Sequence, residues 1–396
     1  CRLGTATGDV RHTPDFIILV PVKRIFLVFA LLLLLVSCDH QPLEQVLFTS
    51  QKVPLEQRQP EHPESLQHTQ AGQSLPQQGG VSCYRIPALA TAPDGHLLAV
   101  CDQRVSSCAD LGGNPDISIV IRTSRNHGRT WSDIRSVVDY PFGQSASDPS
   151  LIVDHVTGTI FLLFNFMDHL QEPGVYYLRV IKSTDNGTTW STPEDITSQI
   201  TQPGWERDFK FITSGRGMQT GSGKLVHTLV NLQKGLYLFA SDNHGQSWYL
   251  MDTALQPGDE SKVIELEDGT WMVNSRVNGA GHRYMHLSSD EGKTWITKAE
   301  ASLADPGCNA GLARVGERLF FSNPDSPDRR ENLTLRVSDD GGKTWSEGKT
   351  ICAGNSAYSS LTVLSGGNVG VLYEREDYKE IVFIRLRESE IFSNKK

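Results

Sequence analysis

Three arginines stand where a guanidinium group could capture an anion. Arg85 lies in the stretch Tyr84-Arg85-Ile86-Pro87, Arg276 closes a strand predicted over 272–276, and Arg330 lies just before Asn332-Leu333. The planar guanidinium fork matches a carboxylate with two parallel hydrogen bonds, so three converging arginines would form a carboxylate site. Each arginine taken alone could equally form a structural ion pair, and the residues by themselves leave this open.

A tyrosine and two aspartates could supply bond-cleaving chemistry. Tyr358 lies in the stretch Ala357-Tyr358-Ser359-Ser360. A tyrosine hydroxyl, with an ordinary pKa of about 10, is a poor nucleophile at neutral pH and needs a base beside it. Taken alone, a tyrosine in a strand is more often a core or rim residue. Asp110 and Asp116 flank Gly112-Gly113-Asn114-Pro115, a cluster that predicts a loop able to carry an acid.

The elements that position these residues are marked by a repeated octamer, Ser-x-Asp-x-Gly-x-Thr-Trp. The copies begin at Ser124, Ser183, Ser241, Ser288 and Ser338. Asn126 and Asn243 replace the aspartate in two copies, and Ser247 replaces the threonine in one. An alternating apolar run before each copy predicts a strand, and Asp or Asn followed by Gly predicts a turn. Each copy is therefore expected to be a hairpin tip, and its tryptophan is expected to start the next strand. The octamer residues are expected to hold the hairpin together and to touch no substrate.

The spacing of the copies predicts an all-β fold, a six-bladed β-propeller. Successive copies lie about 50 to 60 residues apart, and one four-stranded propeller blade needs about 40 to 50 residues. The chain after Trp345 is long enough for one more blade without a copy. Five marked blades and one unmarked blade make six, stacked radially so that only short strand edges remain.

The repeat is similar to the Asp box of sialidases, a family of six-bladed propellers. Tyr84-Arg85-Ile86-Pro87 resembles the Arg-Ile-Pro motif of that family and, as in the family, precedes the first box. Asp boxes also occur in sortilin-like receptors and some glucanases, so the boxes alone imply the fold and not the function. The family binds its substrate carboxylate with three arginines, and the resemblance assigns these roles to Arg85, Arg276 and Arg330. The family pattern Arg-x-Asn-Leu favours Arg330 over Arg329.

The resemblance also assigns catalytic roles. Tyr358 matches the nucleophile, and Glu260 matches the base that removes its proton. A neutral phenol paired with a glutamate avoids bringing a carboxylate nucleophile against the carboxylate of the substrate, and sialidases depart in this way from the usual pair of carboxylates. Asp110 matches the loop aspartate that protonates the leaving oxygen. Its spacing from Arg104 favours it over Asp116.

Three more positions match family residues that hold the substrate. Glu374 matches the glutamate that braces the first arginine, although it could also be a solvated charge at a strand end. Arg104 resembles an arginine on the O4 side of the sugar. Asp148 resembles the residue that faces O4 and the N-acyl nitrogen, but an aspartate before proline is also a common turn element.

These matches imply a retaining exo-α-sialidase. Such an enzyme would hydrolyse terminal sialic acids from glycoproteins, glycolipids and oligosaccharides. A trans-sialidase or intramolecular trans-sialidase would keep the same constellation. A non-catalytic Asp-box propeller that binds glycans would keep the boxes and lose the arginine triad or Tyr358.

The N-terminal part reads as a targeting segment. Residues 1–37 are expected to be a signal segment, and residues 1–20 could be translated upstream sequence. An apolar run ends in Leu35-Val36-Ser37-Cys38, which resembles a bacterial lipobox and implies a lipidated Cys38 on an exported, membrane-anchored protein. The alternative is an ordinary secretory signal or membrane anchor. Residues 38–45 would be a tether, and 46–396 the propeller, with an exposed Gln- and Pro-rich loop at 51–80. Val46-Leu47-Phe48 is expected to be the strand that closes the last blade.

Composition limits the partners and cofactors. The chain has 396 residues and a formal net charge of −9, which argues against nucleic acid as a partner. Sialylated glycans are the expected partners, and the protein is expected to be a monomer without a cofactor. No Cys-x-x-Cys or Cys/His ligand spacing occurs, so no metal is expected. A single disulfide among Cys83, Cys101 and Cys108 is one reading, and buried free thiols are the other.

Overall fold

The computed structural model describes residues 43–50 and 80–391. These residues belong to one unit, Pro42–Lys396. The predicted signal segment, Cys38 and all but the last residue of the predicted loop at 51–80 lie outside the described residues. No helix within the described residues is long and apolar enough to cross a membrane.

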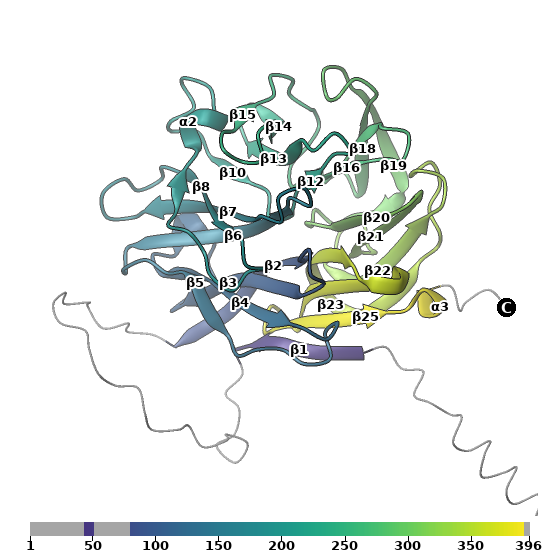
Figure 1. The fold of residues 1–396 in the computed structure, drawn as a ribbon, viewed down its shortest axis with the longest axis horizontal. Coiled ribbons are helices and arrows are strands. Elements are labelled where there is room, and N and C mark those ends of the chain that lie inside the picture. The colour runs from purple at the N-terminus through teal and green to yellow at the C-terminus, as the bar shows by residue number, and fades with distance from the viewer. Residues whose placement is uncertain (1–42, 51–79, 392–396) are drawn as a thin grey trace, which may run out of the picture. The chain divides into compact units, whose positions relative to one another are not determined.

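The regular secondary structure of the described residues is almost entirely β-strand, in five sheets (Figure 1). The first sheet is β2 (Val81–Thr91), β3 (Leu97–Val105), β4 (Ile117–Ser124) and β5 (Arg135–Val138). The second orders β11 (Gly215–Arg216), β6 (Gln144–Val153), β7 (Ile160–Asp168), β8 (Tyr177–Ser183) and β9 (Glu194–Asp195). The third orders β10 (Lys210–Ile212), β13 (Leu225–Asn231), β14 (Gly235–Ser241) and β15 (Tyr249–Leu250), with β12 (Met218–Gln219) on β13.

The remaining two sheets come from the C-terminal half. The fourth is β16 (Ser261–Glu265), β17 (Trp271–Ser275), β18 (His282–Ser288) and β19 (Ile296–Ala304). The fifth has seven strands: β20 (Gly311–Val315), β21 (Arg318–Pro324), β22 (Glu331–Ser338), β23 (Lys349–Val363), β24 (Val369–Arg375), β25 (Glu380–Leu386) and β1 (Leu43–Thr49). Helical pieces are short: α2 (Thr197–Ile200), α3 (Glu388–Ile391) and the 3-10 turns η2 (Leu111–Gly113) and η3 (Ser365–Gly367).

One long strand divides the seven-stranded sheet into two groups of four. The first part of β23 pairs with β22, for example Lys349 with Leu335. The second part pairs with β24, for example Val363 with Val369. The groups are therefore β20 to β23, and β23, β24, β25 and β1. The predicted closing strand at 46–48 is confirmed as β1, which begins earlier, at Leu43, and pairs antiparallel with β25.

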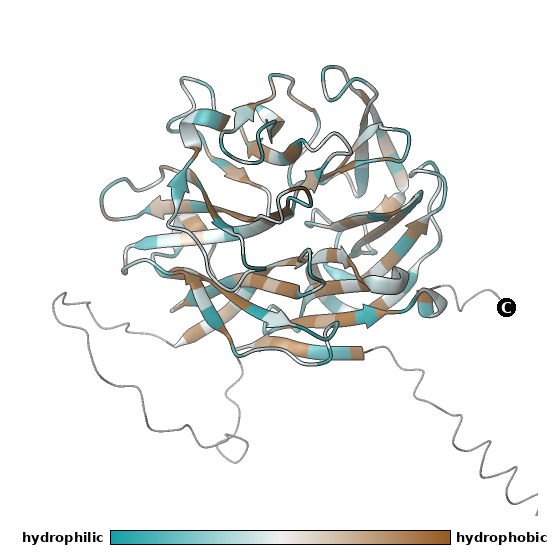
Figure 2. Cartoon of the chain, in the orientation of Figure 1, coloured by the Kyte–Doolittle hydropathy of each residue, from teal (hydrophilic) through white to brown (hydrophobic). Residues whose placement is uncertain are grey.

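Apolar clusters join each group of strands to the next in chain order. One cluster includes Ala88 and Val100 of the first sheet and Leu162 and Phe164 of the second. Further clusters link the second sheet to the third, the third to the fourth, and the fourth to β20 and β21. The last cluster returns to the start, because Phe383 of β25 shares it with strands β2 to β4. Figure 2 shows the apolar residues lying mainly along the strands and the hydrophilic ones in the loops.

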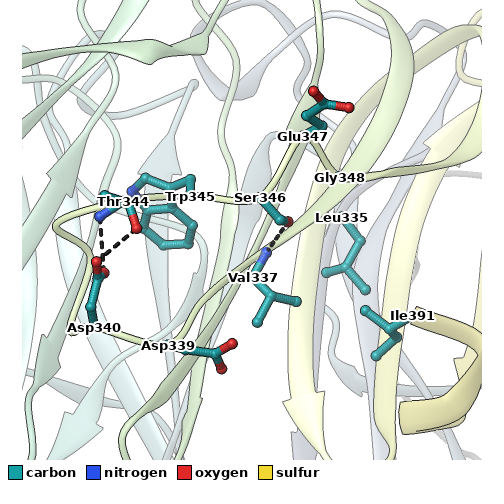
Figure 3. A pocket seen from close by; sticks show the side chains of 10 residues that line it. All are labelled: Leu335, Val337, Asp339, Asp340, Thr344, Trp345, Ser346, Glu347, Gly348 and Ile391. Carbon is teal, nitrogen blue, oxygen red and sulfur yellow. Dashed lines mark hydrogen bonds between the residues drawn. The ribbon is translucent and has the colours of Figure 1, made fainter. Parts of the chain in front are cut away.

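All five octamers form hairpin turns after β4, β8, β14, β18 and β22, as predicted. Figure 3 shows the last copy, where the Asp340 carboxylate accepts hydrogen bonds from Thr344 N at 2.9 Å and Thr344 Oγ1 at 2.7 Å. The same kind of bond from threonine lowers the pKa of Asp185 and Asp290 to about 2. Asn126 makes the same cap, since its Oδ1 accepts the Thr130 amide at 2.9 Å.

The tryptophans differ from the prediction in one respect. Each lies between the turn and the next strand, one residue before that strand in two copies and four residues before it in three, and so does not start it. The indole N–H of Trp131 donates to Gly128 O at 3.2 Å, and that of Trp295 donates to Gly292 O at 3.0 Å. The ring of Trp131 packs against Phe383 of the neighbouring group of strands, with centroids 5.0 Å apart. In these copies the indole therefore closes the turn, and at Trp131 it also fills the space between two sheets.

Strand register places the octamers and the candidate site at opposite ends of the sheets. In the first sheet Ser124, which begins an octamer, lies opposite Leu97, whereas Arg104 lies opposite Ile117. Seven residues of extended strand separate these two ends, roughly 23 Å. In the fourth sheet Ser288 lies opposite Trp271, at the end away from Arg276. The octamers therefore hold the scaffold and leave the other strand ends for chemistry.

Candidate active site

The predicted residues meet in a pocket at the strand ends away from the octamers. Its volume is about 280 Å³. The residues that line it come from segments far apart in the chain: Ile86, Asp110, Leu111, Gly112, Asp148, Tyr176, Phe209, Phe211, Leu232, Asp259, Glu260, Arg276, Asn278 and Tyr358. Five residues named from the sequence are in this set, namely Asp110, Asp148, Glu260, Arg276 and Tyr358.

Tyr358 and Glu260 form the hydrogen-bonded pair at the floor of the pocket. The Tyr358 hydroxyl donates to Glu260 Oε2 at 2.6 Å, although the two residues are 98 positions apart. Tyr358 lies in β23 and is 8% exposed, and Glu260 immediately precedes β16. Burial and the Glu260 carboxylate raise the pKa of Tyr358 well above its usual range, against the effect of Arg276 and Arg330. The phenol therefore stays neutral until Glu260 accepts its proton.

Three guanidinium groups surround the Tyr358 ring. The Arg85 guanidinium lies 5.5 Å from the ring centroid, and that of Arg330 lies 5.2 Å from it. Arg276 Nη1 donates to the Tyr358 hydroxyl at 3.1 Å and also forms a hydrogen-bonded ion pair with Glu260. The three arginines, taken from β2 and from the chain just before β22 and after β17, thus converge on one side chain.

Arg330 is the member of this group without an anionic partner. Among the described residues it forms no ion pair, and its hydrogen bonds go to the Tyr378 hydroxyl at 3.2 Å and Gly307 O at 2.9 Å. Arg329 is different, because its side chain is 71% exposed and pairs with Glu331 at 2.8 Å. The structure therefore places Arg330 beside Tyr358 and Arg329 on the surface, and Arg330 is the one that the pattern Arg-x-Asn-Leu favoured.

Glu374 holds the base of the site together. Its side chain is fully buried in β24, so it is not the solvated strand-end charge that the sequence left open. One oxygen accepts Arg85 Nε at 2.8 Å and Ile86 N at 2.8 Å, and the other accepts Tyr358 N at 3.1 Å. These bonds fix the first arginine and the backbone of the tyrosine relative to each other.

The backbone is strained where it meets Glu374. Ile86 has φ of 62°, a conformation that a β-branched residue rarely adopts. Asp148, which also lines the pocket, has φ of 60°. Residues in such conformations persist only where the surrounding contacts hold them, and they gather at functional sites. At Ile86 the holding contact is the hydrogen bond from its amide to Glu374.

Asp110 lies on the loop between β3 and β4, and its carboxylate reaches the arginines. Arg104 Nη1 donates to Asp110 Oδ1 at 2.7 Å, and Arg85 Nη1 lies 4.0 Å from the same oxygen. Burial opposes the charge, but Arg104 and Arg85 outweigh it, so the pKa of Asp110 is lowered. Asp116 immediately precedes β4 and does not line the pocket, because its side chain is buried beside Asp139.

Arg104 and Asp148 share a buried partner, Asp102. Asp102 Oδ2 accepts Arg104 Nη2 at 3.0 Å and the Ser147 hydroxyl at 2.6 Å, and Oδ1 accepts Asp148 N at 3.0 Å. Burial and the Asp102 carboxylate raise the pKa of Asp148 to about 8. The raised pKa favours the protonated form of Asp148, which is a form that can donate a hydrogen bond.

Several site residues were not named from the sequence. Tyr378 lies in the turn after β24, and the Arg85 guanidinium carbon lies over its ring, 4.0 Å from the ring centroid. Asn278 accepts Arg276 Nε at 2.7 Å. Phe209 and Phe211 line the pocket. Trp205, a few residues earlier in the chain, is buried in the core.

Phe209 also forms the apolar wall of the pocket. Its ring stacks on Tyr176 with centroids 4.6 Å apart and is 41% exposed. Leu232, also exposed, lies on the same wall. The pocket thus has Arg276 beside the Tyr358–Glu260 pair at its floor and apolar residues on one side, which suits a ligand that carries both a carboxylate and apolar groups.

The chain is similar to known proteins over most of its length. Residues 95–371 match the model of the BNR repeat-like domain. A sialidase of Micromonospora viridifaciens is 35% identical over 336 residues, which are 74% of this chain and 50% of that protein. A sialidase of Bacteroides fragilis is 31% identical over 331 residues, 74% of this chain and 60% of that protein. The chain thus spans half to three-fifths of the length of these two relatives.

A solved structure is similar over most of the chain. The Hadza microbial sialidase Hz136 has a TM-score of 0.72 and 30% sequence identity, with 78% of this chain and 67% of that chain covered. The repeat model agrees with the repeated octamers, and the relatives and this structure are sialidases. The chain belongs to the sialidase family of BNR-repeat proteins.

Proposed function

We propose that this protein is a retaining exo-α-sialidase that removes terminal sialic acids from glycans. The observation that carries the proposal is the convergence of Arg85, Arg276 and Arg330 on the hydrogen-bonded pair of Tyr358 and Glu260. Family membership supports the same activity. A neutral sugar would leave the charge of Arg330 unmatched, whereas the carboxylate of a sialic acid would pair with it.

The first chemical step follows from the hydrogen bonds at the floor. Glu260 takes the proton of the Tyr358 hydroxyl as its oxygen attacks the anomeric carbon, and the bond to the leaving oxygen breaks. Because the pKa of Tyr358 is raised, the free phenolate is scarce and proton transfer must accompany attack. The product of this step is a sialyl ether of the tyrosine, formed with inversion.

The leaving oxygen needs a proton, and Asp110 supplies it in this account. In the structure without ligand the arginines lower the pKa of Asp110, which favours its charged form. A bound substrate carboxylate would pair with Arg85 and Arg330 and remove part of that positive field, so the pKa of Asp110 would rise toward the range a general acid requires. Asp110 then accepts a proton from water, whose oxygen attacks the anomeric carbon in the second inversion. The bond from that carbon to the Tyr358 oxygen breaks, and Glu260 returns the proton to Tyr358.

We also propose that the five sheets make six propeller blades. Two blades would share β23, since its two parts pair with different neighbours. The sixth blade carries no octamer, and the topology offers the reason. The octamers connect the third and fourth strands of a blade, but the fourth strand of the last blade is β1, which comes from the other end of the chain.

Product analysis by NMR tests the function. The substrates are two sialyl-lactoses that differ only in linkage. We expect free sialic acid from at least one of them, with the α anomer formed first because two inversions retain configuration. The proposal is contradicted if no sialic acid is released from either substrate, or if the β anomer forms first. Transfer of the sialic acid to another sugar would favour a trans-sialidase. An anhydro-sialic acid would favour an intramolecular trans-sialidase.

The proposed cellular location rests on the sequence of the N-terminal segment. We propose that Cys38 carries a lipid and anchors the exported protein to the bacterial envelope, because Leu35 to Cys38 resembles a lipobox. Cys38→Ala is expected to move the protein from the membrane fraction to the soluble fraction while specific activity is unchanged. Fractionation followed by immunoblotting measures this. Unchanged membrane association in the variant would count against lipidation.

A further inference from the structure

A disulfide links the two segments that carry Arg85 and Asp110. Cys83 in β2 is bonded to Cys108 in the loop between β3 and β4. Each cysteine lies two positions before one of these site residues, and the two site side chains approach to 4.0 Å. Cys83 also lies directly opposite Arg104 in the β2–β3 pairing. The covalent link is thus next to the group that hydrogen-bonds the Asp110 carboxylate.

The two halves of the loop are held in different ways. The second half contains Leu111, which is buried, and Asn114, whose carbonyl accepts the Ser145 hydroxyl at 2.8 Å. The first half, residues 106–110, is exposed at every position. The Asp110 side chain is 83% exposed. Packing therefore fixes the second half of the loop and cannot fix the half that ends in Asp110.

Within the loop, Gly113 N donates to Asp110 O at 2.8 Å and Asn114 Nδ2 donates to Ser107 O at 3.0 Å. Arg104 and the disulfide tether this exposed half to the sheet. Arg104 Nη1 donates to Cys108 O at 2.9 Å as well as to the Asp110 carboxylate. Both bonds end on the first half of the loop, and they can hold only if the main chain at Cys108 stays near β3. The disulfide enforces that position, because it joins Cys108 to the strand paired with β3.

We propose that the Cys83–Cys108 disulfide positions Asp110 for proton transfer to the leaving oxygen. This inference rests on the function proposed above. Cys83 and Cys108 are then positioning residues, and they act through Asp110 and not on the sugar. Loss of the bridge should impair the step that needs an acid and spare steps that do not.

The test compares two substrates in the double variant Cys83→Ser/Cys108→Ser. The leaving group of a sialyl-lactose is the alkoxide of lactose, which needs the proton of Asp110. The leaving group of a methylumbelliferyl sialoside is a stabilised phenolate, which needs that proton little. We expect kcat/KM to fall about tenfold to 100-fold on the sialyl-lactose that wild type cleaves, because a small misplacement of a catalytic group has this effect. On the aryl sialoside we expect a change within about threefold.

Two further variants serve as the positive and the negative control. Asp110→Ala should show the same split between the substrates, and to a greater degree. Cys352→Ser removes a free, half-buried thiol outside the bridge and should match wild type on both substrates. If the double variant does not fold, wild type treated with dithiothreitol, which reduces the disulfide to two thiols, is assayed on the same pair of substrates.

Equal losses on the two substrates would assign the bridge a purely structural role and overturn the inference, as would no loss on either. Wild type that cleaves neither substrate would instead refute the proposed function, so the two failures are distinguishable. Thermal unfolding of each variant shows how much of any loss comes from unfolding.

Discussion

Tyr358→Phe is expected to lower kcat by at least about 10³-fold, because a residue that forms the covalent intermediate has no substitute in the site. Steady-state assays on an aryl sialoside measure this loss. The variant removes the one atom that donates to Glu260 and leaves the ring among the arginines. We therefore expect the fold and much of the affinity for a substrate-like inhibitor to remain.

Tyr373→Phe is the matched control for this variant. Tyr373 is a buried tyrosine in β24, and its hydroxyl lies 3.5 Å from Glu44, outside the site. Loss of that hydroxyl should leave kcat close to wild type. If Tyr358→Phe kept more than a tenth of wild-type kcat, or if the two variants lost activity equally, Tyr358 would not be the nucleophile.

Arg330→Ala is expected to reduce kcat/KM by about 30-fold to a few thousand-fold, which corresponds to the 2–5 kcal/mol lost when one member of a buried charge pair is removed. The substrate carboxylate would lose the arginine that has no anionic partner among the described residues. Arg329→Ala is the neighbouring control. Since Arg329 forms an exposed ion pair worth about 0–1 kcal/mol, we expect less than about a fivefold change.

Kinetics of these two arginine variants distinguish recognition from general destabilisation. If Arg329→Ala lost more kcat/KM than Arg330→Ala, the assignment of Arg330 would be wrong. If both variants lost activity together with a lower unfolding temperature, the effect would come from the fold and not from recognition of the carboxylate.

Local patterns account for what the sequence could predict. Each octamer contains the whole of its turn, so Asp340 and Thr344 are already close in the chain and the hairpin follows from the octamer alone. The strand before each copy follows from alternation of apolar residues. β1 was also predictable as a strand, although its start at Leu43 was not, because the polar residues Glu44 and Gln45 hide the alternation.

Contacts between distant segments account for what the sequence could not predict. Three cysteines were candidates for one bridge, and only the register of β2 on β3 brings Cys83 to Cys108 and leaves Cys101 buried. Tyr378 sits in a turn with no motif, yet the turn places it against Arg85. The resemblance to a family did name Tyr358 and Glu260, but their 2.6 Å hydrogen bond depends on how separate sheets pack.

Trapping the covalent intermediate tests the central claim most directly. A 3-fluoro sialyl fluoride slows both steps by destabilising the positive charge at the anomeric carbon, while its good leaving group still allows the first step, so the intermediate accumulates. Mass spectrometry of a proteolytic digest then locates the label. The account predicts one label, on the peptide that contains Tyr358, and none in Tyr358→Phe. A label on Glu260 or Asp110, or no label under conditions where the reagent inactivates the enzyme, would contradict it.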